Sequence, residues 1–330
     1  MQEILIYHDV SKEDAVITTE VLIEGDRYGH HQHGTNRIFQ ILEGIGKGSI
    51  SLTATPLVLS KGPSFAVIDG QYGLGYPIGH YAMLTAVKKA QSTGVGLVGV
   101  INSSHLGVLS YYTELASKRK SIGIACSTSS PAVVVKGGKV KTFGTNPLSY
   151  SVPYEPHLLT ADFATSKVSR GRIMEYADTS SSIPINWAVD REGKETTSPI
   201  EALSGGLKTL DGDIKGSLIS LLISILAGNL FGGVSNHKVT GTRYMDEKPN
   251  KGDFFLAIDV KQFTNLEKFQ YELKEFMGFI RSQNAEFCVP REKAYMQQLH
   301  KEKTIKVSSK IVDLFDSYKE KVIKNEPNKF

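Results

Sequence analysis

The sequence predicts an α/β fold in which several strands pair antiparallel. Short β-branched runs alternate with amphipathic segments between residues 65 and 128, a pattern typical of strands alternating with helices. The strands predicted after Ser121 follow one another closely, which favours antiparallel pairing. The composition, 40% hydrophobic and 22% charged in 330 residues, excludes a disordered or fibrous chain. It allows one large domain or two to three lobes.

Charge and cysteine content narrow the class of protein. The 38 Lys and Arg residues exceed the 34 Asp and Glu residues by only four, so no nucleic-acid partner is expected. Two cysteines exclude a disulfide framework, and no basic-then-apolar leader begins the chain; we therefore expect a cytoplasmic protein. The apolar stretch Leu218–Gly233 is interrupted by polar residues and falls short of the roughly 18 apolar residues of a spanning helix. We expect a buried helix there and no membrane contact.

The N-terminal part is predicted to be helical. Ser11 and Asp14 resemble a capping box that begins a helix, and Gly25 is expected to end it. A polar, histidine-rich turn occupies residues 26–37, and Ile38–Gly44 begins another helix.

The rest of the chain alternates between the two element types. Residues 235–252 are polar and contain Gly and Pro, so they are expected to form the longest loop. Strands are predicted over Phe65–Ile68, Val95–Ile101, Ser121–Thr128, Pro147–Val152, Leu158–Phe163 and Phe254–Val260. Helices are predicted over Gly79–Ser92, Tyr111–Arg119, Leu218–Leu230, Leu266–Asn284 and Ser308–Lys324.

The turn over residues 26–37 is the first candidate site. It contains His30, His31 and His33, with Arg37 close behind. Imidazole exchanges a proton near neutral pH, and a guanidinium holds a carboxylate through two parallel hydrogen bonds. Together they suit a substrate with a carbonyl beside a carboxylate. A surface turn without function and a metal site are the two alternatives.

The turn after the strand Val95–Ile101 is the second candidate site. Ligand sites in α/β proteins lie at the carboxyl ends of strands, and His105 follows two serines there. It could move a proton or contact a cofactor, or the turn could only cap a helix. The glycines between Gly70 and Gly75 do not form a dinucleotide fingerprint, because their order differs and Pro77 interrupts the expected helix.

Eight short segments occur in a fixed order along the chain: Asp26–Gly29 through His33-Gly34 and Arg37; Asp69-Gly70 with Gly73 and Gly75; Asn102–Gly107; Gly144–Leu148; Asp162–Ser166; Lys215-Gly216; Leu226–Leu230; and Phe254–Asp259. Together they resemble the malate/L-lactate dehydrogenase family of the second, non-Rossmann type. This family includes sulfolactate, ureidoglycolate and 2,3-diketo-L-gulonate oxidoreductases. The resemblance runs from about Ser11 to Leu314.

The resemblance implies an oxidoreductase that uses NAD or NADP to interconvert 2-oxo and 2-hydroxy carboxylic acids. It assigns proton transfer to His33 in some members and to His105 in others, and carboxylate binding to Arg37. The other implied substrate contacts are Thr145, Arg170 and Arg172. The implied cofactor contacts are His105, Asp162, Phe163, Ala164, Lys215, Gly216, Pro290, Arg291 and Glu292.

The family fold implied is a non-Rossmann, sheet-based cofactor domain with a mixed, largely antiparallel sheet, plus a lobe formed from both chain termini. We expect residues 1–65 and 261–330 to supply that lobe and 66–260 the cofactor domain, in a homodimer without metal. Gln32 stands where the family usually has Ser, Arg172 where it often has Lys or Asp, and Arg291 where it has Gly. A non-catalytic protein that binds a dinucleotide or organic acid on this scaffold is the alternative.

Overall fold

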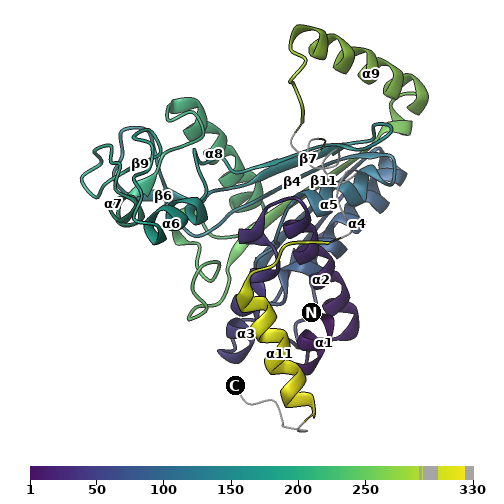
Figure 1. Ribbon diagram of the computed structural model, residues 1–330. Coiled ribbons are helices and arrows are strands. Elements are labelled where there is room, and N and C mark those ends of the chain that lie inside the picture. Colours follow the sequence, from purple (N-terminus) through teal and green to yellow (C-terminus); the bar gives the residue numbers. More distant parts are fainter. Residues whose placement is uncertain (290–291, 293–303, 324–330) are drawn as a thin grey trace.

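A seven-stranded sheet forms the centre of the computed structural model, which describes residues 1–289, 292 and 304–323 (Figure 1). The strand order is β1-β2-β3-β11-β4-β7-β8. Only β2 and β3 pair in parallel within this sheet; every other neighbouring pair is antiparallel. This confirms the mixed, largely antiparallel sheet. The strands are β1 Leu57–Lys61, β2 Phe65–Asp69, β3 Val95–Ser103, β4 Ser121–Ser127, β7 Leu148–Val152, β8 Leu159–Phe163 and β11 Lys251–Asp259.

Helices cover both faces of this sheet, and glycines on the strands let them approach closely. Helices α4 (Gly75–Thr93) and α5 (Ser110–Ser117) share one core with Phe255 and Ala257 of β11. Helix α8 (Ile214–Ala227) covers the opposite face, against Phe254. A Cβ at Gly252 would lie 1.8 Å from the carbonyl oxygen of Ala227, so no other residue fits beneath α8.

Helices from the two ends of the chain pack together in one lobe beside the sheet (Figure 1), whereas β1, within residues 1–65, joins the large sheet. The lobe contains α1 (Gln2–Tyr7), α2 (Lys12–Arg27), α3 (Ile38–Gly46) and α11 (Ser309–Ile323). Ile311 of α11 is buried in the same hydrophobic core as Leu5 of α1. The Oγ of Ser308 donates a hydrogen bond to Oδ1 of Asn36 at 2.6 Å. The C-terminal helix therefore supports the histidine-rich segment.

A second, four-stranded sheet that the sequence did not predict forms its own lobe. Its order is β6-β5-β10-β9, and its strands are only two or three residues long. It has a separate core that includes Ile173 and Leu207. The elements are β5 Val133–Val134, β6 Lys141–Phe143, β9 Ala188–Val189 and β10 Gly206–Leu207, with α6 Arg170–Asp178 and α7 Pro199–Ser204.

Two predicted helix boundaries near the site are wrong. Helix α2 continues through Gly25 to Arg27, because Gly25 serves close packing: a Cβ there would lie 2.8 Å from the carbonyl oxygen of His33. Helix α4 begins at Gly75 and includes Pro77. Proline is tolerated there because the first turn of a helix needs no donated backbone hydrogen bond.

Helix α8 is half exposed, which corrects the prediction of a buried helix. Ile214, Leu218 and Leu222 are each more than half exposed, whereas Ser220 and Ser224 face the interior. The window Ile214–Phe231, of which 44% is buried, is long and apolar enough to cross a membrane, so the predicted shortfall in length is wrong. Length and composition alone are weak grounds for a membrane span, since core helices share both.

Candidate functional site

A buried carboxylate fixes the histidine-rich segment after α2. Asp26, 6% exposed, accepts hydrogen bonds from the backbone N–H and the hydroxyl of Thr35, at 2.8 and 2.5 Å. Its other oxygen lies 3.0 Å from Nδ1 of His31. A Cβ at Gly34 would lie 2.1 Å from Oδ1 of Asp26, so this position accepts only glycine. These contacts hold the intervening His33 in one place.

The turn after β3 fixes the second histidine. The Oγ of Ser104 accepts a hydrogen bond from the backbone N–H of Gly75 at 2.8 Å, which seats the turn on the start of α4. Nδ1 of His105 lies 2.8 Å from the backbone N–H of Gly107. Because a backbone N–H can only donate, Nδ1 accepts, and the neutral ring carries its proton on Nε2.

The structure brings the two candidate histidines into contact. Nδ1 of His33 lies 3.3 Å from Nε2 of His105, and the rings stack with centroids 5.2 Å apart. Since His105 carries its proton on Nε2, it is the donor and Nδ1 of His33 is the acceptor. The neutral pair therefore has a fixed direction, with the unprotonated nitrogen of His33 at the point of contact.

Both histidines are held neutral. Burial, and then the nearby Arg37 charge, lower the pKa of His33 from 6.5 to about 3. Burial and Arg37 also hold the pKa of His105 well below its usual value, with smaller contributions from His33 and Lys251. Neutral imidazoles accept protons at physiological pH, so the pair can serve as a base.

Arg37 lies beside the histidine pair with much of its hydrogen-bonding capacity available. Its Nε donates to the carbonyl oxygen of Gln32 at 2.7 Å, and its Nη1 donates to Oε1 of Gln40. Among the residues that the structure describes, no carboxylate pairs with this guanidinium. It is therefore positioned to bind the carboxylate of a ligand. Gln32 contributes through its backbone, so its difference from the usual Ser does not alter this contact.

Tyr76 is a site residue that the sequence analysis missed. It is 1% exposed, and its hydroxyl has no hydrogen-bond partner among the described residues. Its ring centroid lies 6.4 Å from that of His105. Burial raises the pKa of Tyr76, and Arg37 opposes that rise, so the hydroxyl is a neutral donor. The sequence feature that could have indicated Tyr76 is its position directly after Gly75, in the glycine-rich segment.

Thr145 and the start of α6 lie near the same site, but the two predicted arginines of α6 differ. The backbone N–H of Thr145 donates to Oγ of Ser129 at 3.1 Å. Arg170 contacts Sδ of Met174 and pairs with no carboxylate in the described chain. The Nη1 of Arg172 lies 2.7 Å from a carboxylate oxygen of Glu175 at the surface.

A backbone hydrogen bond joins the segment that follows β8 to the segment that precedes α8, and these two elements carry predicted cofactor residues. The backbone N–H of Leu210 donates to the carbonyl oxygen of Thr165 at 2.8 Å, one residue after Ala164. Gly216 leaves no room for a side chain beside Asp211, and Lys215 is exposed next to it. The ring of Phe163 is 37% exposed. The cofactor contacts assigned to Lys215 and Phe163 stay predictions.

Two other predicted cofactor residues have structural partners. Asp162 accepts a hydrogen bond from the backbone N–H of Ser110 at 2.8 Å, at the start of α5. A carboxylate oxygen of Glu292 lies 2.9 Å from Nε2 of His157 and 2.5 Å from Arg281. Pro290 and Arg291 lie outside the described residues. The cofactor contacts assigned to these four residues stay predictions.

No group of three metal-ligating side chains occurs within the part of the chain that the structure describes. His31 turns to Asp26, whereas His33 turns to His105. The two histidines of the proposed metal site therefore have different partners.

A buried ion pair lies directly under the His105 turn. The Nζ of Lys251 lies 2.5 Å from both carboxylate oxygens of Asp253, and the two side chains are 3% and 0% exposed. Ser103 of β3 and Ser127 of β4 donate to the same carboxylate at 2.7 and 2.6 Å. This network joins the three central strands at the end from which His105 projects.

The fold and site are those expected of an oxidoreductase of the 2-hydroxy acid type. A neutral histidine pair can exchange a hydroxyl proton, and the arginine beside it pairs with no described carboxylate and can bind that of a substrate. The malate/L-lactate dehydrogenase family model matches residues 1–315. The chain belongs to this family. It is an NAD(P)-dependent 2-hydroxy acid dehydrogenase.

Individual relatives support the assignment over nearly the whole chain. A malate/(S)-sulfolactate dehydrogenase of Methanothermus fervidus is 36% identical over 305 residues, 92% of this chain and 90% of the relative. A ureidoglycolate dehydrogenase (NAD(+)) of Escherichia coli K12 is 32% identical over 81% of this chain and 76% of the relative. The solved sulfolactate dehydrogenase of Methanocaldococcus jannaschii has a TM-score of 0.87 at 32% identity, covering 94% of this chain and 91% of that chain.

Proposed function

We propose that the protein oxidises a short 2-hydroxy acid of the malate or sulfolactate type, and reduces the corresponding 2-oxo acid, at the His33–His105 pair. The observation that carries this proposal is the 3.3 Å contact between the two imidazoles, beside an arginine that no described carboxylate neutralises. The names of the relatives support this substrate class. The cofactor, NAD or NADP, is proposed to bind at the lysine-bearing start of α8.

Arg37 binds the substrate carboxylate through its guanidinium, which places the neighbouring hydroxyl carbon beside the imidazoles. When bound, a nicotinamide cofactor supplies the two-electron chemistry by exchanging a hydride with that carbon. In the free protein the single lone pair of Nδ1 of His33 accepts from the Nε2–H of His105. When the substrate hydroxyl takes the place of that donor, Nδ1 accepts the hydroxyl proton during oxidation and returns it during reduction. The Nε2–H of His105 then donates to the same substrate oxygen.

The test measures oxidation of NADH and of NADPH against a panel of 2-oxo acids that includes oxaloacetate, pyruvate and a cyclic-imine carboxylate. Turnover is expected with at least one 2-oxo acid. His33→Ala and His105→Ala should each reduce kcat by roughly 10²–10⁴-fold, the range of a single general acid or base. His237→Ala, at an exposed position, is the control. Cofactor binding without any turnover would favour the non-catalytic alternative.

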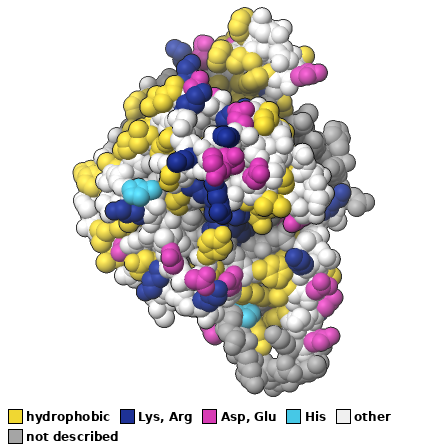
Figure 2. All heavy atoms as spheres, turned by 90° about the vertical axis from the view of Figure 1, so that its left-hand side faces the viewer, with side chains coloured by type: hydrophobic (Ala, Val, Ile, Leu, Met, Phe, Trp, Pro, Cys, Tyr) yellow, Lys and Arg dark blue, Asp and Glu magenta, His cyan; other side chains and the backbone are white. Residues whose placement is uncertain are grey.

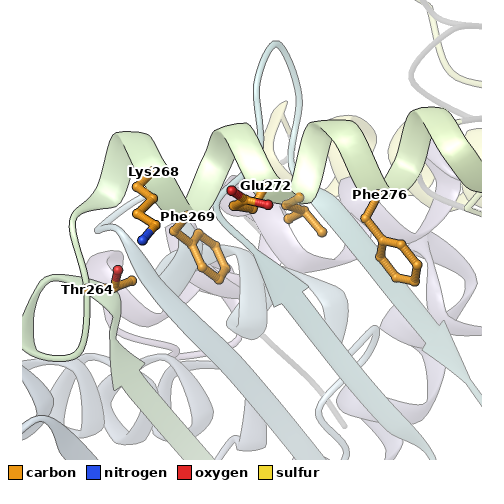
Figure 3. A pocket seen from close by; sticks show the side chains of 6 residues that line it. Thr264, Lys268, Phe269, Glu272 and Phe276 are labelled. Atoms are coloured by element: carbon orange, nitrogen blue, oxygen red, sulfur yellow. The ribbon is translucent and has the colours of Figure 1, made fainter.

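We also propose that the protein is a homodimer in which a second copy covers α8 and α9 (Leu266–Gln283). Helix α9 stands away from the body of the protein (Figure 1), and only Met277 of it is buried. Its Phe276 and Phe279 are about 60% exposed, and Phe269 and Phe276 line a pocket on its inner side (Figure 3).

Large apolar surfaces of this kind are typical of subunit interfaces. Phe276→Asp should convert the dimer into monomers in sedimentation-velocity experiments. The exposed change Lys12→Met should leave the dimer intact. A monomeric wild-type protein at working concentration would refute the proposal.

A further inference from the structure

Arg243 lies in the loop between the short helix over Asn236–Lys238 and β11, and this loop is held firmly. The side-chain amide of Gln40 donates to the carbonyl oxygens of Thr242 and Arg243, at 3.3 and 3.0 Å. The hydroxyl of Thr242 accepts from the backbone N–H of Ser130 at 2.9 Å. The Nη2 of Arg243 donates to the carbonyl oxygen of Pro131 at 3.4 Å. The guanidinium is therefore positioned by both its loop and its own contact.

The same contacts place the backbone of Arg243 close to that of the substrate-binding segment. Gln40 joins the two arginines, because its Oε1 accepts from Nη1 of Arg37 while its Nε2 donates to the backbone of Arg243. The loop also reaches the segment of Thr145. The backbone N–H of Thr145 donates to the hydroxyl of Ser129, and the next residue, Ser130, binds Thr242. The loop of Arg243 thus contacts Gln40, a partner of Arg37, and Ser130, the neighbour of the residue that binds Thr145.

Arg170 approaches the same place from the start of α6. The side chain of Gln32 fills the space beside Gly171, within 2.6 Å of where a Cβ would lie, and its backbone oxygen binds Arg37. Burial, and then the charge of Arg170, lower the pKa of Arg243. The two positive charges therefore lie close enough to disfavour one another.

Neither Arg170 nor Arg243 pairs with a carboxylate among the residues that the structure describes, although both are partly buried. Figure 2 shows Lys and Arg side chains gathered near the middle of the face that presents the small sheet, with Asp and Glu side chains on the surface around them. Partly buried cations that repel each other are costly unless an anion neutralises them. No described carboxylate supplies that anion, and an anionic ligand would neutralise the two arginines.

We propose that Arg243 and Arg170 form a second anion subsite that binds the distal carboxylate or sulfonate of a doubly anionic 2-oxo or 2-hydroxy acid. This inference rests on the proposed function, because the first carboxylate of that substrate is the one bound by Arg37. The two subsites would select malate-like acids over lactate-like acids. Arg243 is then a specificity-determining residue, and hydride transfer itself does not depend on it.

The test compares Arg243→Met with the wild type on oxaloacetate, on its sulfonate analogue and on pyruvate, which lacks the distal anion. Loss of charged hydrogen bonds to the distal group should lower kcat/KM for one or both doubly anionic acids about 10–100-fold. The value for pyruvate should change by less than about threefold. Arg243→Lys should recover part of the loss, since it restores the charge. Arg119→Met, at an exposed position, is the matched control.

The two doubly anionic substrates show which distal group the subsite prefers. The substrate whose kcat/KM falls more in Arg243→Met carries the preferred group, carboxylate or sulfonate. An equal loss on all three substrates, no loss on any, or a wild type that prefers pyruvate overturns the inference. So does a selective loss of NADPH over NADH binding, which would assign Arg243 to the phosphate of the cofactor. A wild type that turns over no 2-oxo acid would refute the proposed function instead. Thermal unfolding of Arg243→Met and Arg243→Lys checks that both variants fold.

Discussion

Replacing Lys251 by methionine should destabilise the protein by about 3–5 kcal/mol, because it leaves a buried carboxylate without its counter-charge. Asp253 is 0% exposed and would keep only the hydroxyl donors of Ser103 and Ser127. For a domain of this order of size, each kcal/mol lowers Tm by roughly 2–4 °C. A fall of roughly 6–20 °C is therefore expected, measured by circular dichroism at a fixed scan rate.

A second substitution separates the charge from the packing. Adding Asp253→Asn to Lys251→Met removes the uncompensated charge, while the amide oxygen still accepts from one serine, so at least ~1 kcal/mol should return. The exposed change Lys12→Met should stay within about 0.5 kcal/mol of the wild type. The reasoning is refuted if Lys251→Met costs less than ~1 kcal/mol, or if the double variant is no more stable than the single one.

Three other predictions concern the site. The pKa of His33 near 3 makes the pair neutral above about pH 5, so kcat/KM for hydroxy-acid oxidation should be flat from about pH 6 to 8 and fall only at lower pH; a pH profile with an ascending limb near 6.5 would contradict this. Tyr76→Phe removes a buried hydroxyl without a described partner, so urea unfolding should show unchanged or higher stability; a loss above ~1 kcal/mol would reveal a missed partner. Gly34→Ala forces a Cβ into Asp26 and should lower kcat at least tenfold; wild-type kcat would show that the segment can shift.

The sequence was sufficient to identify the individual candidate residues of the site, but it did not show which of them contact one another. His33 and His105 each stood out in a polar turn, yet they are 72 residues apart. They meet because α2, which precedes the His33 segment, packs against α4 and against the turn that carries His105. Arg243 lies in a segment predicted as a loop, where nothing local distinguishes an arginine that faces a ligand from one that faces water. Its role depends on Gln40, about 200 residues earlier in the chain.

The errors in the fold prediction have similar physical causes. A glycine after an amphipathic run usually ends a helix, which is why Gly25 was predicted as the end of α2. Here the glycine lies inside the helix because the backbone of His33 packs against it too closely for a side chain. Strands of two residues, such as Val133–Val134, are too short for an alternating pattern. Hydrophobicity predicts that an apolar helix is buried, but it does not say whether the same chain or a second copy buries it. The exposure of α8 in the single chain could therefore not be predicted. The long central strands, by contrast, were found within a few residues of their bounds.

The position of β11 has a consequence for the synthesis of this protein. It is the central strand of the large sheet and lies between β3 and β4, yet it leaves the ribosome only after 250 other residues. Until then the sheet consists of two halves, each with an unpaired edge that can recruit a foreign strand. Helix α11, which supports the histidine-rich segment, emerges still later. A nascent chain therefore needs protection through most of translation, and the His33 segment gains its full support only once residues beyond 300 have been made.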